Sequence, residues 1–229
     1  MSMIVNYANM VAYPGRSAIT TIENNNLRSK YQVTSLFYDW LDFPWERQYR
    51  KWRPIILKEV KGDVLEAGIG TGRNLAHYPP DVSLTAIDLS PGMIQQAQKR
   101  APLSSCSVTL QEADAADLRS FTSNCFDWYI ATFLYCVMPD VIQPLAIQEM
   151  ARVLKPGGRF CLLEIVYSKN RWICLRQKCI APFVRFVYGA QFDRSTLDHI
   201  AQIPSLQVTE TRYLKDDTYL LIQGKKTIA

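Results

Sequence analysis

The residues of this chain best suited to chemistry are three alternating glycines, Gly68, Gly70 and Gly72, which stand two to six residues after Glu66. Glycine lets a backbone turn sharply and approach a ligand closely, because no Cβ obstructs the turn. Asp88 ends the next apolar run, where a carboxylate can accept hydrogen bonds from two ribose hydroxyls. Together these residues indicate a nucleoside site at the start of a helix.

The spacing of the glycines distinguishes between ligands. They follow Gly-x-Gly-x-Gly, whereas the dinucleotide fingerprint is Gly-x-Gly-x-x-Gly, whose third glycine packs a helix beneath a pyrophosphate. A negative charge on Glu66 repels phosphate and suits a cation that carries an ammonium group. S-adenosylmethionine meets both requirements, and a nicotinamide dehydrogenase is the less favoured alternative.

Two further segments extend the pattern. Asp114 follows the strand-like run 107–110, and a carboxylate at that position can accept a hydrogen bond from an adenine amine. The run 126–132 is a strand that ends in Thr132, at the sheet edge where doubly wound folds bind ligands. Singly these signals are weak, since a lone carboxylate also caps helices, but their order is specific.

Strand-like and helical runs alternate between residues 63 and 166 with short connections. This alternation predicts an α/β fold, a doubly wound and mostly parallel seven-stranded Rossmann-like sheet with helices on both faces. A last helix at 197–203 and two closing strands predict a terminal antiparallel hairpin. The expected strands are 64–66, 84–87, 107–110, 128–132, 159–166, 207–213 and 218–222, and the expected helices within the alternation are 73–78, 91–101 and 143–153.

The chain is expected to form one domain behind a loosely packed N-terminal arm. Pro44 is expected to divide the lid region into two helices, and a turn at 155–158 precedes the fifth strand. The parts are an arm (1–28), lid helices (29–60), a cofactor-binding core (61–166), an acceptor-site insertion (167–195), and the terminal helix and hairpin (196–229).

Three motifs in this order resemble those of class I S-adenosylmethionine-dependent methyltransferases, over roughly residues 60–166. Residues 65–72 are similar to the family's glycine loop, 87–93 to its ribose and adenine motif, and 153–158 to its turn before the fifth strand. The resemblance implies a methyltransferase that binds S-adenosylmethionine and releases S-adenosylhomocysteine.

The resemblance also implies roles for individual residues. Glu66 and the loop would hold the methionine moiety, Asp88 the ribose, and Asp114 the adenine amine. Leu89 and Met93 would face the adenine, and Tyr31, Tyr38 and Asp39 are candidates for a lid over the cofactor. The full set of expected cofactor residues is Tyr31, Glu66, Gly68, Gly70, Thr71, Gly72, Asn74, Asp88, Leu89, Met93, Asp114, Ala115, Ala131 and Thr132.

Methyl transfer depends on positioning and desolvation more than on a protein base, so the absence of an obvious base does not count against activity. The catalytic candidates are Tyr31, Tyr38, Asp39 and Tyr135, with the alternative that the first three are core or helix-surface residues. Residues 132–136 contain no Asn-Pro-Pro-Tyr-type tetrapeptide, which argues against nucleic-acid or protein amide acceptors.

The net charge of +5 is concentrated in two segments that mix basic and aromatic residues, 43–53 and 169–188. The second segment alternates four basic residues with apolar ones at helical spacing, which favours peripheral contact with an anionic membrane. The alternative is a packed helix with a solvated basic face.

The segments that flank the three motifs resemble the branch of quinone C-methyltransferases and bacterial phosphatidylethanolamine N-methyltransferases. We therefore expect a small apolar or amphipathic acceptor, with a phospholipid amine ahead of a quinone, a thiol or another metabolite. A cofactor-binding scaffold without transferase activity is the alternative from another class. Binding of nucleic acid is not expected.

The composition limits the cellular locations that we expect for the protein. No apolar run approaches the roughly 20 residues of a spanning helix, and residues 1–28 lack the blocks of a secretion signal. We expect a cytoplasmic protein, with or without peripheral membrane association. Six cysteines without a Cys-x-x-Cys pair predict reduced thiols, and with only two histidines no metal site is expected.

Overall fold

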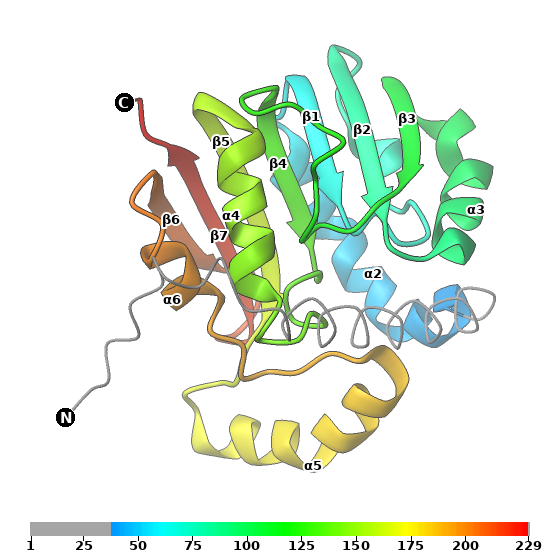
Figure 1. The fold of residues 1–229 in the computed structure, drawn as a ribbon. Coiled ribbons are helices and arrows are strands. Elements are labelled where there is room, and N and C mark those ends of the chain that lie inside the picture. The colour runs from blue at the N-terminus through cyan, green and yellow to red at the C-terminus, as the bar shows by residue number, and fades with distance from the viewer. Residues whose placement is uncertain (1–37, 229) are drawn as a thin grey trace.

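The computed structural model describes residues 38–228, so the predicted arm and Tyr31 lie outside the described residues. Seven strands form one sheet in the order β3-β2-β1-β4-β5-β7-β6 (Figure 1). Strands β1 to β5 are parallel, and β7 runs antiparallel to both β5 and β6. The strands are β1 Gly62–Ala67, β2 Val82–Asp88, β3 Ser107–Glu112, β4 Phe126–Thr132, β5 Leu154–Ile165, β6 Leu206–Tyr213 and β7 Tyr219–Lys226. The predicted α/β fold with its terminal hairpin is confirmed.

Local sequence signals account for the starts and ends of two helices near the site. Ser90 precedes α3 and accepts a hydrogen bond from the backbone of Met93 over 3.4 Å. Asn170 caps α5 in the same way, and Gly189 ends it in a left-handed conformation with φ of 74°. The described helices are α2 Tyr38–Leu57, η2 Leu75–His77, α3 Pro91–Arg100, η3 Ala101–Leu103, α4 Gln143–Val153, α5 Arg171–Tyr188 and α6 Thr196–Ala201.

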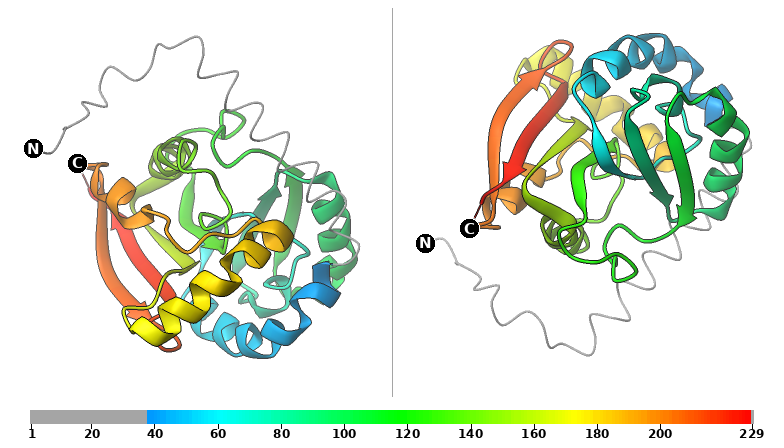
Figure 2. Two further views of the ribbon diagram at one scale, coloured as in Figure 1. Left: turned by 90° about the horizontal axis from the view of Figure 1, so that it is seen from below. Right: turned by 90° about the horizontal axis from the view of Figure 1, so that it is seen from above.

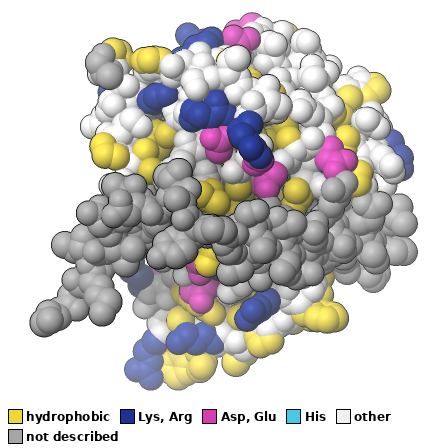
Figure 3. Space-filling view, in the orientation of Figure 1, with side chains coloured by type: hydrophobic (Ala, Val, Ile, Leu, Met, Phe, Trp, Pro, Cys, Tyr) yellow, Lys and Arg dark blue, Asp and Glu magenta, His cyan; other side chains and the backbone are white. Residues whose placement is uncertain are grey.

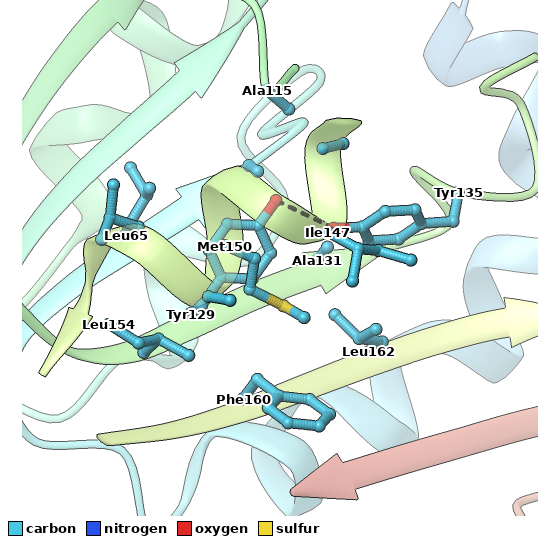
Figure 4. Packing of buried hydrophobic residues seen from close by; sticks show 14 of the residues in the cluster. Leu65, Ala115, Tyr129, Ala131, Tyr135, Ile147, Met150, Leu154, Phe160 and Leu162 are labelled. Carbon is cyan, nitrogen blue, oxygen red and sulfur yellow. Dashed lines mark hydrogen bonds between the residues drawn. The ribbon is translucent and has the colours of Figure 1, made fainter. Parts of the chain in front are cut away.

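The two faces of the sheet are covered by different helices. On one face, α4 and α6 bury side chains such as Ile147 and Ile200 against Phe160, and Figure 4 shows this packing around β4 and β5. On the other face, α2 and α3 bury Trp52 and Ile94 against the same sheet. Coverage on both sides explains why the central strands are apolar almost throughout.

The helix before the sheet differs from its prediction. Instead of two helices divided at Pro44, one helix, α2, continues from Tyr38 to Leu57. A proline removes a single backbone hydrogen bond, whereas the burial of Trp52 and Ile56 against the sheet stabilises the helix as a whole. Packing therefore outweighs the local helix-breaking signal.

The structure also differs from the predictions for two short segments. The helix expected at 73–78 is only the 3-10 turn η2, Leu75–His77. The turn expected at 155–158 lies within the first residues of β5, where the pairing register with β4 shifts between Phe126 and Trp128. Gly157, with φ of 79°, lets the strand absorb this irregularity without ending.

The predicted insertion forms α5, which lies across the carboxyl ends of the parallel strands (Figure 1). Seen from below, α5 crosses the molecule from the side of the hairpin toward the side of α3 (Figure 2, left). Among residues 38–228, none of the helices combines the length and apolar character that a membrane span requires. All six cysteines are free thiols.

Candidate functional site

A cavity of about 640 Å³ lies where the carboxyl ends of β1, β2 and β4 meet α2, α5 and the start of β7. Its size falls in the range of small-molecule sites, and its position is the one expected of a doubly wound sheet. The expected cofactor residues that line it are Gly68, Gly70, Thr71, Asn74, Asp88, Leu89, Met93, Asp114, Ala115 and Thr132. We call this side of the cavity the donor half.

Asp88 joins the two principal motifs of the donor half. Its carboxylate accepts a hydrogen bond from the backbone N–H of Gly70 over 2.9 Å and another from Ser90 over 2.9 Å. Burial raises the pKa of Asp88 to about 6, although these backbone donors act in the opposite direction. Since each carboxylate oxygen can accept more than one hydrogen bond, the group retains capacity for a ligand's hydroxyls.

Gly70 leaves room beside this carboxylate. Its φ is 56°, and a Cβ added there would meet no atom within 4 Å, so the space above the loop belongs to the cavity. Gly68 and Ile69 donate to the carbonyl of Ile87 over 2.9 and 3.0 Å, which fixes the loop to the end of β2. A loop held in this way, with an acid beside it and open space above, fits an adenosine ribose.

Glu66 lies beneath the loop and does not line the cavity. It is fully buried, and its two oxygens accept hydrogen bonds from Asn74 Nδ2 over 2.6 Å and from the Tyr78 hydroxyl over 2.8 Å. Burial raises the pKa of Glu66 to about 7. Asn74, which does line the cavity, separates Glu66 from any ligand, so the carboxylate acts through Asn74. Gly72 and Ala131 are likewise buried behind the lining.

Asp114 and Met93 complete the donor half. Asp114 Oδ1 accepts a hydrogen bond from the backbone of Ala116 over 2.8 Å, and burial raises the pKa of the carboxyl group. Met93 is buried at the start of α3 and lines the cavity beside Leu89. Two apolar side chains and a carboxyl group are the partners that the faces and amine of an adenine require.

The candidate Tyr135 does not line the cavity. Its ring lies fully buried in the core, and its hydroxyl hydrogen-bonds that of Tyr129 over 3.2 Å (Figure 4). Burial raises the pKa of this hydroxyl well above its usual value. The candidates Tyr38 and Asp39 form the start of α2, and Tyr31 lies outside the described residues.

The other side of the cavity, which we call the acceptor half, is built around three aromatic rings. Tyr49 of α2 lies with its ring centroid 4.7 Å from that of Phe133, which follows β4. Tyr219, the first residue of β7, lies 5.9 Å from Tyr49 and 6.4 Å from Phe133. Three elements far apart in the chain therefore place aromatic faces at one point.

Phe133 holds an uncommon backbone conformation at this point. Its φ is 59°, in the left-handed region that residues other than glycine seldom adopt. The backbone N–H of Phe133 donates to Leu163 over 2.7 Å, so the bend is held by the neighbouring strand. Strain of this kind collects at functional sites, and here it turns an aromatic ring toward the acceptor half.

The inner side of α5 closes the acceptor half. Five of its lining residues, Ile173, Gln177, Ile180, Val184 and Tyr188, recur at intervals of three and four and so share one helix face, and Arg176 lines the cavity from the edge of that face. Apart from Arg176, Gln177 and the hydroxyl of Tyr188 these side chains are apolar. The acceptor half is thus fitted to a ligand with a substantial apolar part.

Several of these residues were not predicted as site residues. Trp45, Tyr49 and Arg53 line the cavity from one face of α2, a pattern visible in their spacing of four. Tyr219 carried no local signal, because its place depends on the antiparallel pairing of β5 with β7, in which Ile165 lies opposite Tyr219. Sequence periodicity finds a helix face but not a long-range register.

Comparisons with known proteins agree with this geometry. Residues 64–158 match a methyltransferase domain family. The chain is 31% identical over 173 residues to a ubiquinone/menaquinone biosynthesis C-methyltransferase of Geotalea daltonii, covering 68% of this chain and 72% of that one. It is 30% identical over 151 residues to a phosphatidylethanolamine N-methyltransferase of Cereibacter sphaeroides, covering 65% and 72%.

Solved structures share the fold at low sequence identity. A geranyl diphosphate C-methyltransferase of Streptomyces coelicolor, determined with S-adenosylhomocysteine, superposes with a TM-score of 0.63 at 13% identity and 80% coverage of each chain. An S-adenosylmethionine-dependent methyltransferase of Methanosarcina mazei gives 0.55 at 20% identity, covering 77% of this chain and 98% of that one.

The chain belongs to the class I S-adenosylmethionine-dependent methyltransferases. It is accordingly an enzyme, and its cofactor is S-adenosylmethionine. This confirms the expected family and argues against the alternative of a nicotinamide dehydrogenase.

Proposed function

We propose that this enzyme transfers a methyl group to an amphipathic, lipid-like acceptor, with the amine of a phospholipid as the first candidate. The observation that carries the proposal is the division of one cavity into two halves. The donor half presents Asp88, Asp114 and the glycine loop, while the acceptor half is aromatic and apolar. A water-soluble polar acceptor would gain little from such a lining.

In the donor half, Asp88 would accept hydrogen bonds from the ribose of S-adenosylmethionine and Asp114 from its adenine amine. Met93 and Leu89 would contact the adenine ring, and Asn74, held by Glu66, would face the methionine moiety. Bound S-adenosylmethionine supplies an electrophilic methyl group on a positively charged sulfur. Thr132, at the end of β4, lies where the donor half meets the acceptor half.

In the acceptor half, the rings of Tyr49, Phe133 and Tyr219 suit an amine. Methylation moves positive charge from sulfur to nitrogen, and aromatic faces stabilise a cation at that position. Apolar walls exclude water, which favours the neutral, nucleophilic form of the amine. The ammonium proton is released to solvent as the amine enters the apolar site, and these residues then position and desolvate the neutral nitrogen, whose lone pair forms the new N–C bond as the S–C bond breaks.

Two cations on the cavity lining suit the rest of such an acceptor. Arg176 of α5 and Lys215, before β7, are both exposed and both line the cavity. Among the described residues Arg176 has no hydrogen-bond or ion-pair partner, so its guanidinium is available to a phosphate. A phosphate beside an amine is the headgroup of phosphatidylethanolamine.

A reduced quinone is the second candidate. The same rings offer flat faces to a planar ring, and arginine near it stabilises the phenolate that makes a ring carbon nucleophilic. Arg53 and Arg176 both line the cavity. Relatives that match the chain carry the names of enzymes acting on either class of acceptor.

A direct transfer assay separates the two candidates. The purified protein is incubated with methyl-labelled S-adenosylmethionine and, in separate samples in detergent, with phosphatidylethanolamine or a reduced demethylated quinone. We expect label in the phospholipid headgroup, and mass spectrometry of the extracted lipid locates it on nitrogen. Label in the quinone ring alone selects the second candidate. Label in neither, from a protein that binds S-adenosylhomocysteine, overturns a lipid-like acceptor.

A further inference from the structure

The helix α5 has two unlike apolar sides. The side that contains Ile173 and Val184 lines the cavity. The other side leaves Trp172, Phe183 and Phe186 exposed to 67%, 59% and 82%. Large exposed aromatic side chains gathered on one helix face mark an interaction surface, because they gain nothing from water. We call this side the outer face of α5, and it also carries Leu175.

Basic side chains border the outer face. Arg171, Lys178 and Arg185 recur every seventh residue and therefore form a row along the helix beside the aromatic residues. The guanidinium of Arg171 lies over the ring of Trp172, 4.8 Å from its centroid. The helix contains no acidic residue, so nothing on it offsets this positive charge. Figure 3 shows hydrophobic and basic side chains side by side at the lower end of the molecule, where α5 lies.

The outer face is not needed to hold α5 in place. Gln177, on the inner side, accepts from the backbone of Ser168 over 2.8 Å and donates to the carbonyl of Val166 over 3.0 Å. The Asp217 carboxylate accepts hydrogen bonds from Ser168 and Lys169 at the start of the helix. The helix is thus fixed from its inner side, and the aromatic side chains of its outer face stay exposed.

We propose that the outer face of α5 lies on the surface of an anionic phospholipid bilayer, with its aromatic side chains among the headgroups and its row of cations over the lipid phosphates. Aromatic residues favour the boundary between water and hydrocarbon, and basic residues beside them are attracted to acidic lipids. Because α5 carries basic residues and no acidic ones, its charge is complementary to a surface that is negative throughout. A protein partner is therefore less favoured than an anionic membrane.

This orientation connects the bilayer with the active-site cavity, and in that respect the inference rests on the proposed lipid-like acceptor. Ile180 lines the cavity and is nevertheless 43% exposed, and Arg176 also has both properties. The cavity therefore reaches the surface along the edge of α5 that would lie at the membrane. An acceptor can enter from the lipid layer without transferring its apolar part into water.

Vesicle binding tests the surface independently of catalysis. The full chain, without cofactor, is sedimented with vesicles of phosphatidylcholine alone or mixed with phosphatidylglycerol. We expect binding to the anionic vesicles that falls in high salt, and quenching of Trp172 fluorescence by brominated acyl chains that a Trp172→Phe variant loses. Equal or absent binding to the two vesicle types overturns the proposal.

Two pairs of substitutions locate the contact. Arg171→Gln with Lys178→Gln should weaken binding to anionic vesicles roughly 10–30-fold, and Phe183→Ser with Phe186→Ser should weaken it roughly tenfold or more. The matched controls are Lys58→Gln with Lys61→Gln, before β1, and Leu103→Ser, which is 64% exposed in η3. Variants of α5 that bind as tightly as the unmodified chain contradict the proposal.

A transfer assay in detergent separates the surface from the acceptor. The four substituted side chains do not line the cavity, so the α5 variants should retain full activity toward a detergent-solubilised acceptor. Loss of vesicle binding with retained activity in detergent supports the membrane surface. Intact vesicle binding with no transfer to any lipid-like acceptor leaves the surface in place and overturns the proposed function.

Discussion

Arg53 donates from Nε to the side-chain oxygen of Asn74 over 2.9 Å and thereby joins α2 to the glycine loop. The amide of Asn74 donates in turn to Glu66 over 2.6 Å and to Thr132 over 3.2 Å. The side chain of Asn74 thus connects three elements around the donor half, namely α2, β1 and the end of β4. Arg53 is itself fixed by Glu46, which accepts from both of its terminal nitrogens over 2.6 and 3.0 Å.

Replacing Arg53 with alanine should weaken both the fold and cofactor binding. The variant loses the hydrogen bond to Asn74 and leaves Glu46 without one partner, which should lower the free energy of unfolding by about 1–3 kcal/mol. Because Asn74 then turns more freely, affinity for S-adenosylhomocysteine should fall several-fold in calorimetry. Lys51→Ala, at an exposed position of the same helix, is the control and should change neither quantity.

Replacing Asp88 with alanine should weaken the binding of S-adenosylhomocysteine by about 1–3 kcal/mol, the range for lost hydrogen bonds to a charged group. The loop also loses the acceptor that fixes Gly70, so part of the lost affinity comes from a less ordered loop. Calorimetry with the purified variant measures the change. Unchanged affinity would remove Asp88 from the ribose site.

Cofactor affinity should rise with pH through the titration of Asp88. Burial places the pKa of this carboxyl group at about 6 in the free enzyme, and only the ionised form accepts hydrogen bonds from both ribose hydroxyls. The bound cofactor therefore favours ionisation, and affinity increases from pH 5 to pH 7. Glu66, with a pKa of about 7, titrates nearby, so Asp88→Asn is needed to isolate the contribution. A pH dependence that survives in Asp88→Asn assigns the effect to the other carboxyl groups of this region, Glu66 and Asp114.

Glu164 should make the folded state less stable as the pH rises. Burial raises its pKa from 4.5 to about 8, and within residues 38–228 its Oε2 atom has no hydrogen-bond partner. The folded state therefore binds a proton that the unfolded state has released above pH 4.5. The stabilisation is complete below that pH and is lost progressively up to pH 8, on the order of 5 kcal/mol. Denaturation at both pH values should show a smaller loss in Glu164→Gln than in the unmodified enzyme.

Gly72 and Gly70 should respond differently to alanine, although both have a positive φ. At Gly72, with φ of 82°, a Cβ would lie 2.9 Å from the Cα of Ala97 and 2.8 Å from a methyl group of Leu75. At Gly70 it would meet nothing within 4 Å. Gly70→Ala should cost about 1–2 kcal/mol of stability from backbone strain alone, and Gly72→Ala clearly more. Thermal unfolding compares them, and equal melting temperatures would contradict the packing at Gly72.

The residues of the donor half could be predicted because they belong to motifs that are local in the sequence. The glycine loop, Asp88 and Asp114 each follow a strand directly, and parallel strands bring their carboxyl ends to one edge. The expectation for Glu66 was less accurate, since strand alternation places its side chain beneath the loop, where Asn74 and Tyr78 enclose it.

The acceptor half was less predictable, because it depends on backbone bends and long-range pairing. Tyr135, three residues after β4, was a catalytic candidate. The left-handed conformation of Phe133 redirects the chain and returns Tyr135 to the core, where no alternation rule applies. Pro44 likewise signals the end of a helix that packing prolongs.

The division of the cavity has a consequence for how the enzyme acquires new acceptors. The donor half comes from the stretch that matches the methyltransferase family, residues 64–158, whereas most of the acceptor half comes from α2, α5 and the start of β7, outside it. Substitutions in these flanking elements, other than at Arg53, are therefore expected to alter what is methylated while leaving the affinity for the methyl donor intact. The chain thus keeps the residues that hold the donor largely separate from those that face the acceptor.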